Sequence, residues 1–171
     1  MLKSAKKRTQ SVTQNWESTR SLIDGVIVKD VKSVVSQNAV ITELFRNDWG
    51  LGDDDLHQAT LLAFHPGVTT AWDLHERQKD HVMCIKGVLR LALYDDRKKS
   101  STRGDVDVFY LSEKRPQLIV IPPNIWHAFQ NLLNETSQIV NFFNHRFQHK
   151  EPDSWHLPSD TDRIPYHFPP L

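Results

Sequence analysis

The chain has 171 residues, 39% of them hydrophobic, and its 21 basic residues are balanced by 21 acidic ones. This length and hydrophobic content are typical of one globular domain, and the zero net charge excludes recruitment of nucleic acid or of an anionic membrane by an overall field. The single cysteine, Cys84, excludes an internal disulfide and any cysteine-based zinc cage.

The N-terminal residues 1 to 20 are rich in Lys, Ser, Thr and Gln and carry few apolar residues, a composition that predicts a mobile arm. They lack the apolar core of a signal peptide, and no segment of the chain has the apolar length that spans a bilayer. Since a lone cysteine also fits a reducing compartment, we expect a soluble, cytoplasmic protein without a membrane partner.

Residues 21 to 145 alternate between short apolar runs and polar turns, and they show no long helical period. Such a pattern predicts an all-β sandwich or barrel. The tail, residues 146 to 171, is rich in Pro, His and aromatic residues, and we expect it to pack on the barrel as an extended segment. The clearest strand candidates are residues 57–64, 88–94, 106–111, 117–121, 127–132 and 138–143.

Four polar residues follow the same alternation and predict a pocket. Asp73 and His75 are two positions apart, so on a strand they project from one face, and after a short turn Asp80 and Cys84 return to that face. His127 follows a Leu-Ile-Val-Ile run and enters from another strand. We expect a buried, inert thiol at Cys84 and convergence of the four polar side chains on one cavity.

The spacing of two stretches, Gly67 to Gly87 and Pro122 to Asn131, resembles the two sequence motifs of the cupins. Asp73 stands in place of the first motif histidine, Asp80 in place of the motif glutamate, and Asn124 in place of the second-motif glycine. This resemblance implies a cupin double-stranded β-helix, or jelly-roll barrel, with a cavity between its sheets.

Within the cupins the chain is similar to the dTDP-4-dehydrorhamnose 3,5-epimerase family. The similarity lies in residues 95–104, which read Asp-x-Arg-x-x-Ser-x-Thr-x-Gly, in Leu111-Ser112, and in residues 117–122. It implies a divergent epimerase or isomerase that transfers protons beside the ketone of a dTDP-4-keto-6-deoxyhexose and requires no cofactor. It also implies a homodimer, because members of the family exchange N-terminal strands.

The resemblance further implies which residues form the site. The family's histidine base, lysine and tyrosine acid fall on Asp73, Asp80 and either Val140 or Asn141, so His75 and His127 become the expected acid and base. Trp126 precedes His127 and faces outward on a strand, or stacks on a base or sugar in a loop. The predicted catalytic residues are Asp73, His75, His127 and Asp160, and the predicted substrate-binding residues are Glu43, Asp80, Trp126 and Asn141.

Two other readings of the same residues stay open. Asp73, His75, Asp80 and His127 occupy the four cupin ligand positions, and two histidines with one or two carboxylates suit Fe(II), Mn(II) or Zn(II). The chain would then be a metal-dependent cupin enzyme. The third reading is a barrel that binds carbohydrate without catalysis.

Overall fold

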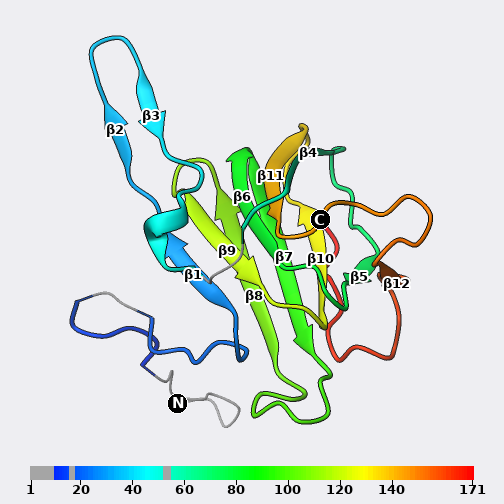
Figure 1. Cartoon of the computed structure of the whole chain (residues 1–171). Helices are drawn as coiled ribbons and strands as arrows, with labels where there is room; N and C mark the ends of the chain where they lie inside the picture. The colour runs from blue at the N-terminus through cyan, green and yellow to red at the C-terminus, as the bar shows by residue number, and fades with distance from the viewer. Residues whose placement is uncertain (1–9, 16–17, 52–54) are drawn as a thin grey trace, which may run out of the picture.

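The computed structural model describes residues 10–15, 18–51 and 55–171. The described chain forms two five-stranded antiparallel sheets and a separate hairpin, with a 3₁₀ turn at Asn47–Trp49 (Figure 1). The strands are β1 (Ile27–Asp30), β2 (Ser33–Val35), β3 (Val40–Thr42), β4 (Gln58–Phe64), β5 (Trp72–Leu74), β6 (Asp80–Lys86), β7 (Val88–Asp95), β8 (Val106–Ser112), β9 (Gln117–Ile121), β10 (Ile125–Asn131), β11 (Ser137–Phe143) and β12 (Trp155–Leu157).

The first sheet has the strand order β1-β9-β6-β11-β4 and the second β12-β5-β10-β7-β8, while β2 and β3 pair only with each other. This arrangement confirms the predicted all-β, jelly-roll architecture, and the long strands fall on the apolar runs of the sequence. The short strand β12 was not predicted. It pairs with β5 through Trp155 to Leu157, and a segment of this length carries too little alternation to be recognised.

The core lies between the two sheets and follows the alternation of each strand. In β7, Leu89, Leu91 and Leu93 are fully buried against the opposite sheet, whereas Ala92 packs on the outer face. Each fully buried aliphatic side chain contributes roughly 1.5–3 kcal/mol. The buried residues between the sheets are Ile23, Val26, Phe64, Val82, Cys84, Leu89, Leu91, Leu93, Leu111, Ile119, Ile121, Ile125, Phe129 and Ile139.

The inner face of strand β6 is apolar at one end and polar at the other. Val82 and Cys84 belong to the core between the sheets, and Met83 belongs to a cluster on the outer face. Burial raises the pKa of the Cys84 thiol to about 11, so the thiol is protonated at neutral pH and the predicted buried cysteine is confirmed. Two residues before Val82, the same face presents Asp80, which is only 2% exposed.

The C-terminal segment covers the outer face of the second sheet. Ile164 is buried there in one cluster with Trp72 and Ala128, and Tyr166 and Phe168 pack against that cluster. The Trp72 ring contacts the Tyr166 ring edge-on, with centroids 6.3 Å apart. The tail therefore packs on the barrel through its aromatic residues, as expected from its composition. The boundaries assigned to arm, barrel and tail stay a prediction.

The predicted arm of residues 1 to 20 lies partly outside the described residues. Its last residue, Arg20, is fixed: the guanidinium forms an ion pair with the buried carboxylate of Asp107 and donates a 2.7 Å hydrogen bond to the Val106 carbonyl. Asp107 also accepts a 2.8 Å bond from the Ile23 backbone N–H. The chain is thus anchored to β8 before it enters β1.

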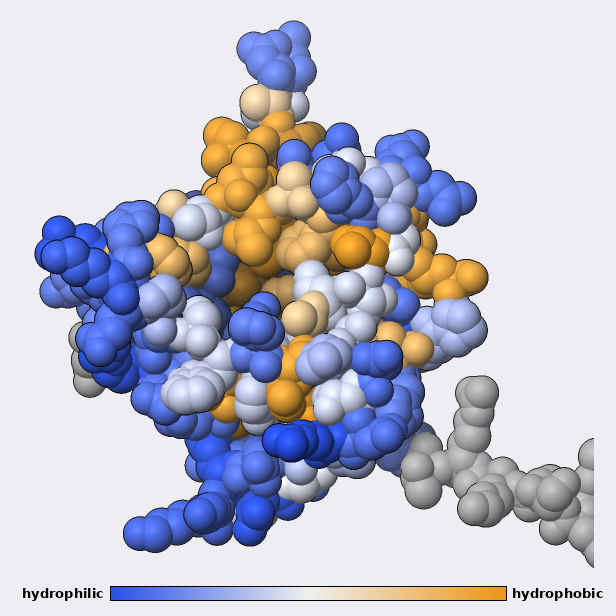
Figure 2. Space-filling view, turned by 90° about the vertical axis from the view of Figure 1, so that its right-hand side faces the viewer, coloured by the Kyte–Doolittle hydropathy of each residue, from blue (hydrophilic) through white to orange (hydrophobic). Residues whose placement is uncertain are grey.

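The β2–β3 hairpin projects from the rest of the molecule (Figure 1). Its aliphatic side chains stay exposed: Val34 by 63%, Val35 by 76%, Val40 by 64% and Ile41 by 60%. Figure 2 shows hydrophobic residues gathered along the stem of this projection, beneath a hydrophilic tip. Four exposed aliphatic residues on one short hairpin form an apolar surface that no other described part of the chain covers.

Candidate functional site

A cavity of about 370 Å³ opens between the two sheets, and it is lined by all four of the polar residues expected to converge. Asp73 comes from β5, His75 from the loop after it, Asp80 from β6 and His127 from β10. Their placement together is confirmed, while their chemical roles remain predictions. The remaining wall is largely apolar or neutral and consists of Thr60, Leu62, Phe64, Thr70, Gln78, Phe129, Ile139, Asn141, Phe143, Phe147 and Ser154.

The turn between β5 and β6 is held by Asp153, a residue far along the chain. Its carboxylate accepts backbone N–H bonds from Glu76 at 3.1 Å and from Arg77 and Gln78 at 2.9 Å. Burial raises the pKa of the Asp153 carboxyl, but these three donors outweigh burial and lower the pKa below its ordinary value. Asp153 is therefore a charged anchor that fixes the approach of His75 to the cavity.

Both histidines of the site are oriented through Nδ1. His75 Nδ1 bonds to the Asp153 backbone carbonyl, with Ser154 Oγ at 3.3 Å, and His127 Nδ1 lies 3.1 Å from the Ile125 carbonyl. A carbonyl only accepts, so Nδ1 carries the proton in each neutral ring and Nε2 keeps its lone pair. Both Nε2 atoms consequently reach the cavity as bases or as ligands.

The two Nε2 atoms face the carboxylate of Asp80. Its Oδ1 accepts hydrogen bonds from Gln78 Nε2 at 2.7 Å and from Asn141 Nδ2 at 3.1 Å. Its Oδ2 lies 3.6 Å from His75 Nε2 and 3.5 Å from His127 Nε2. These two distances are too long for good hydrogen bonds. One carboxylate oxygen and two imidazole lone pairs thus face one another. A proton or a cation bound between them would stabilise this arrangement.

The same three side chains fit a metal ion. The ligand atoms of His75, Asp80 and His127 all lie within 4.8 Å of one another. Ligands at about 2.1 Å from a tetrahedral ion are roughly 3.4 Å apart, close to the 3.5 and 3.6 Å observed here. Asp73 lines the cavity but is not part of this cluster, so three of the four predicted ligand residues lie together.

Three of the predicted site residues do not line the cavity. Asp160 is exposed in the C-terminal segment, and His75 is instead contacted by the backbone carbonyl of Asp153. Trp126 packs on the outer face of its sheet, as strand alternation requires beside the inward His127. Glu43 is 55% exposed and pairs with Arg46 at 3.2 Å. These three residues therefore lie outside the cavity of the described chain, and their assigned roles stay predictions.

Of the two candidates on β11, Asn141 lines the cavity and Val140 does not. Asn141 holds Asp80 through its amide nitrogen, while its oxygen accepts the His81 backbone N–H at 3.1 Å. Gln78 and Asp153 were not predicted. Their roles depend on contacts across the fold, and no local motif marks them, although Gln78 does lie inside the turn that the sequence placed at the site.

Comparison with known proteins gives a family and close relatives. A family model described as dTDP-4-dehydrorhamnose 3,5-epimerase matches residues 22–164. A probable low-salt glycan biosynthesis epimerase, Agl13 of Haloferax volcanii, is 37% identical over 139 residues, covering 81% of this chain and 89% of the relative. The spore coat polysaccharide biosynthesis protein SpsL of Bacillus subtilis is 31% identical over 147 residues, covering 86% and 97%.

Solved structures support the fold. A dTDP sugar isomerase from Desulfovibrio desulfuricans superposes with a TM-score of 0.78 at 20% identity, covering 84% of this chain and 90% of that one. A Legionella pneumophila 3,5-epimerase in complex with dTDP-4-keto-L-rhamnose gives 0.78 at 16% identity, covering 88% and 82%. At these identities the match establishes the jelly-roll architecture.

Proposed function

The chain belongs to the dTDP-4-dehydrorhamnose 3,5-epimerase family, and from this premise we propose that it moves a proton at a carbon beside the ketone of a nucleotide-linked 4-keto-6-deoxyhexose. The observation that supports the proposal is the facing arrangement of His75, Asp80 and His127 in one cavity. The glycan and polysaccharide roles of the relatives fit a substrate of this class.

Proton transfer beside a ketone needs a base and a donor near the ketone oxygen. In the proposed mechanism the Nε2 lone pair of His75 accepts the proton from carbon, and the electron pair of the broken C–H bond passes to the ketone oxygen as an enolate. Asp80 Oδ2, 3.6 Å from that nitrogen, stabilises the imidazolium that forms. Water then delivers a proton to the opposite face of the carbon as the enolate electron pair returns to it, which inverts its configuration, and His75 releases the abstracted proton to solvent.

His127 and Asp80 supply the second half of the reaction. When His127 carries a proton on Nε2, it donates to the enolate oxygen, and its 7% exposure keeps water from competing for that bond. Asn141 and Gln78 hold Asp80 through Oδ1, so that Oδ2 stays directed at both rings. Asp73 lies opposite His127 in the β5–β10 pairing and is assigned to a sugar hydroxyl.

Isotope exchange tests this proposal. Incubation with dTDP-4-keto-6-deoxyglucose in heavy water is expected to place deuterium at a ring carbon beside the ketone, followed by NMR or mass spectrometry. We expect His75→Ala to slow the exchange by about 100-fold or more, the usual effect of losing a general base. The control Asp96→Asn alters an exposed loop carboxylate and should exchange at the wild-type rate. Absence of exchange with any nucleotide 4-ketosugar would leave the carbohydrate-binding barrel as the better reading.

A second candidate function, a metal-dependent enzyme, is favoured by the two Nε2 lone pairs beside one carboxylate oxygen. His75, Asp80 and His127 would hold Fe(II), Mn(II) or Zn(II), and such an ion would polarise a bound carbonyl. The backbone carbonyls that fix both Nδ1 atoms are the kind of outer partners that orient metal-binding histidines. The proton-transfer proposal requires no cofactor.

Metal content separates these two candidates. If the site is a metal centre, dialysed protein reconstituted with Mn(II) or Zn(II) retains about one ion per chain, and His127→Ala loses it because one of three ligands is gone. Asp73→Asn is the matched control, since this residue lines the cavity outside the ligand cluster, and it should retain the ion. Equal metal content in wild type and His127→Ala would exclude this centre.

We also propose a homodimer in which the β2–β3 hairpin packs on a second copy of the chain. The exposed aliphatic residues Val34, Val35, Val40 and Ile41 support this assignment. An apolar hairpin of this kind is stable in water when a partner covers it. Light scattering should report a dimer for the wild type and a monomer for the double variant Val35→Lys, Ile41→Lys.

A further inference from the structure

The cavity between the two sheets carries an excess of negative charge. Its wall contains the carboxylates of Asp73 and Asp80, and the described chain places no lysine or arginine among the lining residues. His75 and His127 are neutral while Nδ1 alone carries a proton, so the two carboxylates are then uncompensated. One negative charge remains even after His127 accepts a proton on Nε2. A ligand of this cavity therefore meets a negative electrostatic potential.

The two carboxylates differ in their surroundings. Asp80 accepts hydrogen bonds from Gln78 and Asn141, and it faces both histidines. The Asp73 carboxylate accepts no hydrogen bond and forms no ion pair with any residue that the structure describes, although Asp73 is half-buried. A half-buried carboxylate has lost part of its water, and without a partner this loss is not compensated. Asp73 is thus the acceptor in the cavity that a ligand can complete.

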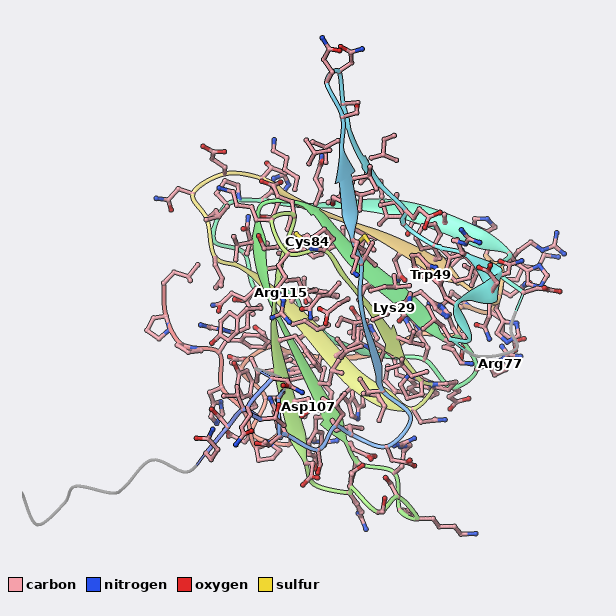
Figure 3. All side chains as sticks on the ribbon, turned by 90° about the vertical axis from the view of Figure 1, so that its left-hand side faces the viewer. Lys29, Trp49, Arg77, Cys84, Asp107 and Arg115 are labelled. Carbon is pink, nitrogen blue, oxygen red and sulfur yellow. The ribbon has the colours of Figure 1, made fainter. Side chains whose placement is uncertain are left out.

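Cationic side chains of the protein that could neutralise Asp73 are placed elsewhere. The Lys29 ammonium lies 4.8 Å from the centre of the Trp49 ring, beside which Figure 3 labels it. Arg115 takes part in an exposed ion pair. Figure 3 shows Arg77 at the edge of the molecule, where it lines a neighbouring cleft and not the cavity. The charge of the cavity is therefore left for a ligand to balance.

The position of Asp73 indicates which part of a sugar it meets. Asp73 and His127 are directly opposite each other in the β5–β10 pairing, and side chains so placed have Cβ atoms about 4.5–5.5 Å apart. In the proposed mechanism His127 donates to the oxygen on carbon 4. Of the two neighbouring carbons, carbon 5 carries the methyl group, so the polar substituent within reach of Asp73 is the one on carbon 3. The apolar part of the wall, which suits that methyl group, consists of Leu62, Phe64, Phe129, Ile139, Phe143 and Phe147.

We propose that Asp73 selects substrates with an amino group on carbon 3, so that the preferred substrate is a nucleotide-linked 3-amino-4-keto-6-deoxyhexose. The ammonium ion forms an ion pair with Asp73, whereas the hydroxyl group of the neutral sugar donates one hydrogen bond to the same carboxylate. Charge complementarity of this kind favours one ligand over another of the same shape. The class of sugar rests on the proposed function, and the preference for an amine rests on the charge of the cavity.

Two ligands without a ketone test this preference apart from any reaction. The sugars dTDP-3-amino-3,6-dideoxyglucose and dTDP-6-deoxyglucose differ only in the group on carbon 3, and calorimetric titration measures the affinity of each. We expect the wild type to bind the amine at least about tenfold more tightly, a ratio that corresponds to about 1.4 kcal/mol. Asp73→Asn, which keeps the shape and removes the charge, should bind the two sugars with equal affinity.

Two further variants serve as controls. Asp73→Glu keeps the negative charge and should keep the preference for the amine. Thr60→Val removes a neutral hydroxyl group from the same cavity and should show the same ratio of affinities as the wild type. Thermal denaturation of each variant establishes that it is folded.

The outcomes separate this inference from the proposed chemistry. Equal affinity of the wild type for the two sugars, or an undiminished preference in Asp73→Asn, would overturn selection by Asp73. A preference that depends on Asp73, without deuterium exchange into a 4-keto sugar, would support the selection and count only against proton transfer. If the wild type binds neither sugar, the proposed function and this inference both fail.

Discussion

Two buried aspartates of this chain, Asp95 and Asp80, have opposite surroundings. Asp95 at the end of β7 is 0% exposed, and Asp80 at the start of β6 is 2% exposed. Both lie on strands of the barrel, and both belong to stretches that resemble a family motif. The difference between them is in the number of donors that each carboxylate receives, and that difference separates a structural carboxylate from one available for chemistry.

The Asp95 carboxylate is saturated with donors. Arg97 donates to it through Nε and a terminal nitrogen, both at 2.9 Å, and through its backbone N–H at 2.9 Å. Ser100 and Thr102 add hydroxyl bonds of 2.6 and 2.8 Å. A buried carboxylate with five donors is fully compensated for the water it has lost. Asp95 therefore fixes the loop between β7 and β8.

Asp80 is compensated on one oxygen only. Gln78 and Asn141 satisfy Oδ1, whereas Oδ2 faces His75 and His127 at distances beyond a good hydrogen bond. A half-satisfied carboxylate is an unfavourable way to stabilise a core. The arrangement is instead suited to a group that arrives and leaves, such as a proton.

The largest expected effect is on stability at Asp95. Asp95→Asn replaces an acceptor by an amide nitrogen that faces Arg97 and two hydroxyl groups, so we expect the free energy of unfolding to fall by about 3 to 5 kcal/mol, the usual cost of breaking a buried ion pair. Urea denaturation followed by circular dichroism measures it. The neighbouring Asp96→Asn, with its carboxylate 57% exposed, should change stability by less than about 0.5 kcal/mol. An equal loss of unfolding free energy in the two variants would contradict the structural role assigned to Asp95.

The second prediction concerns the stability of the protein at acidic pH. Burial raises the pKa of the Asp95 carboxyl, but the bonds from Arg97, Ser100 and Thr102 outweigh burial and hold the pKa well below its usual range. A group with a lowered folded pKa contributes stability that is present above its unfolded value, about 3.9, and is lost as the pH falls below that value. We expect wild type to lose stability more steeply than Asp95→Asn between about pH 4 and pH 2. If the free energy of unfolding falls with pH equally in the two proteins, Asp95 is not the cause of the acid sensitivity.

The third prediction is that the same substitution at Asp80 changes stability much less than it does at Asp95. Asp80→Asn keeps an acceptor for Gln78 and Asn141 and directs an amide donor at the histidine lone pairs, so we expect the free energy of unfolding to change by less than about 1 kcal/mol. Deuterium exchange should fall by about 100-fold or more, because the imidazolium loses its stabilising charge. A large loss of stability with unchanged exchange would reverse the roles of the two residues.

Much of the site could be predicted because it follows strand alternation. Asp73, His75, Asp80 and His127 were expected on one inner face, and they line one cavity. The two-residue period places side chains on a face whatever the distance between strands. The same rule should have removed Trp126 from the site, since it is adjacent to His127. Asp160 and Glu43 were assigned by likeness to a family motif, and neither lines the cavity.

The sequence by itself thus determined the faces of the strands, the turn between Asp73 and Asp80, and the apolar core that continues from them, because these depend on neighbours within a few residues. Only the tertiary structure decided which groups meet. Asp153 contacts His75 although the two residues are 78 positions apart in the sequence. Asp73 lies outside the cluster of His75, Asp80 and His127 although it lines the same cavity. The packing of two sheets sets such distances to within an ångström, and no local pattern encodes them.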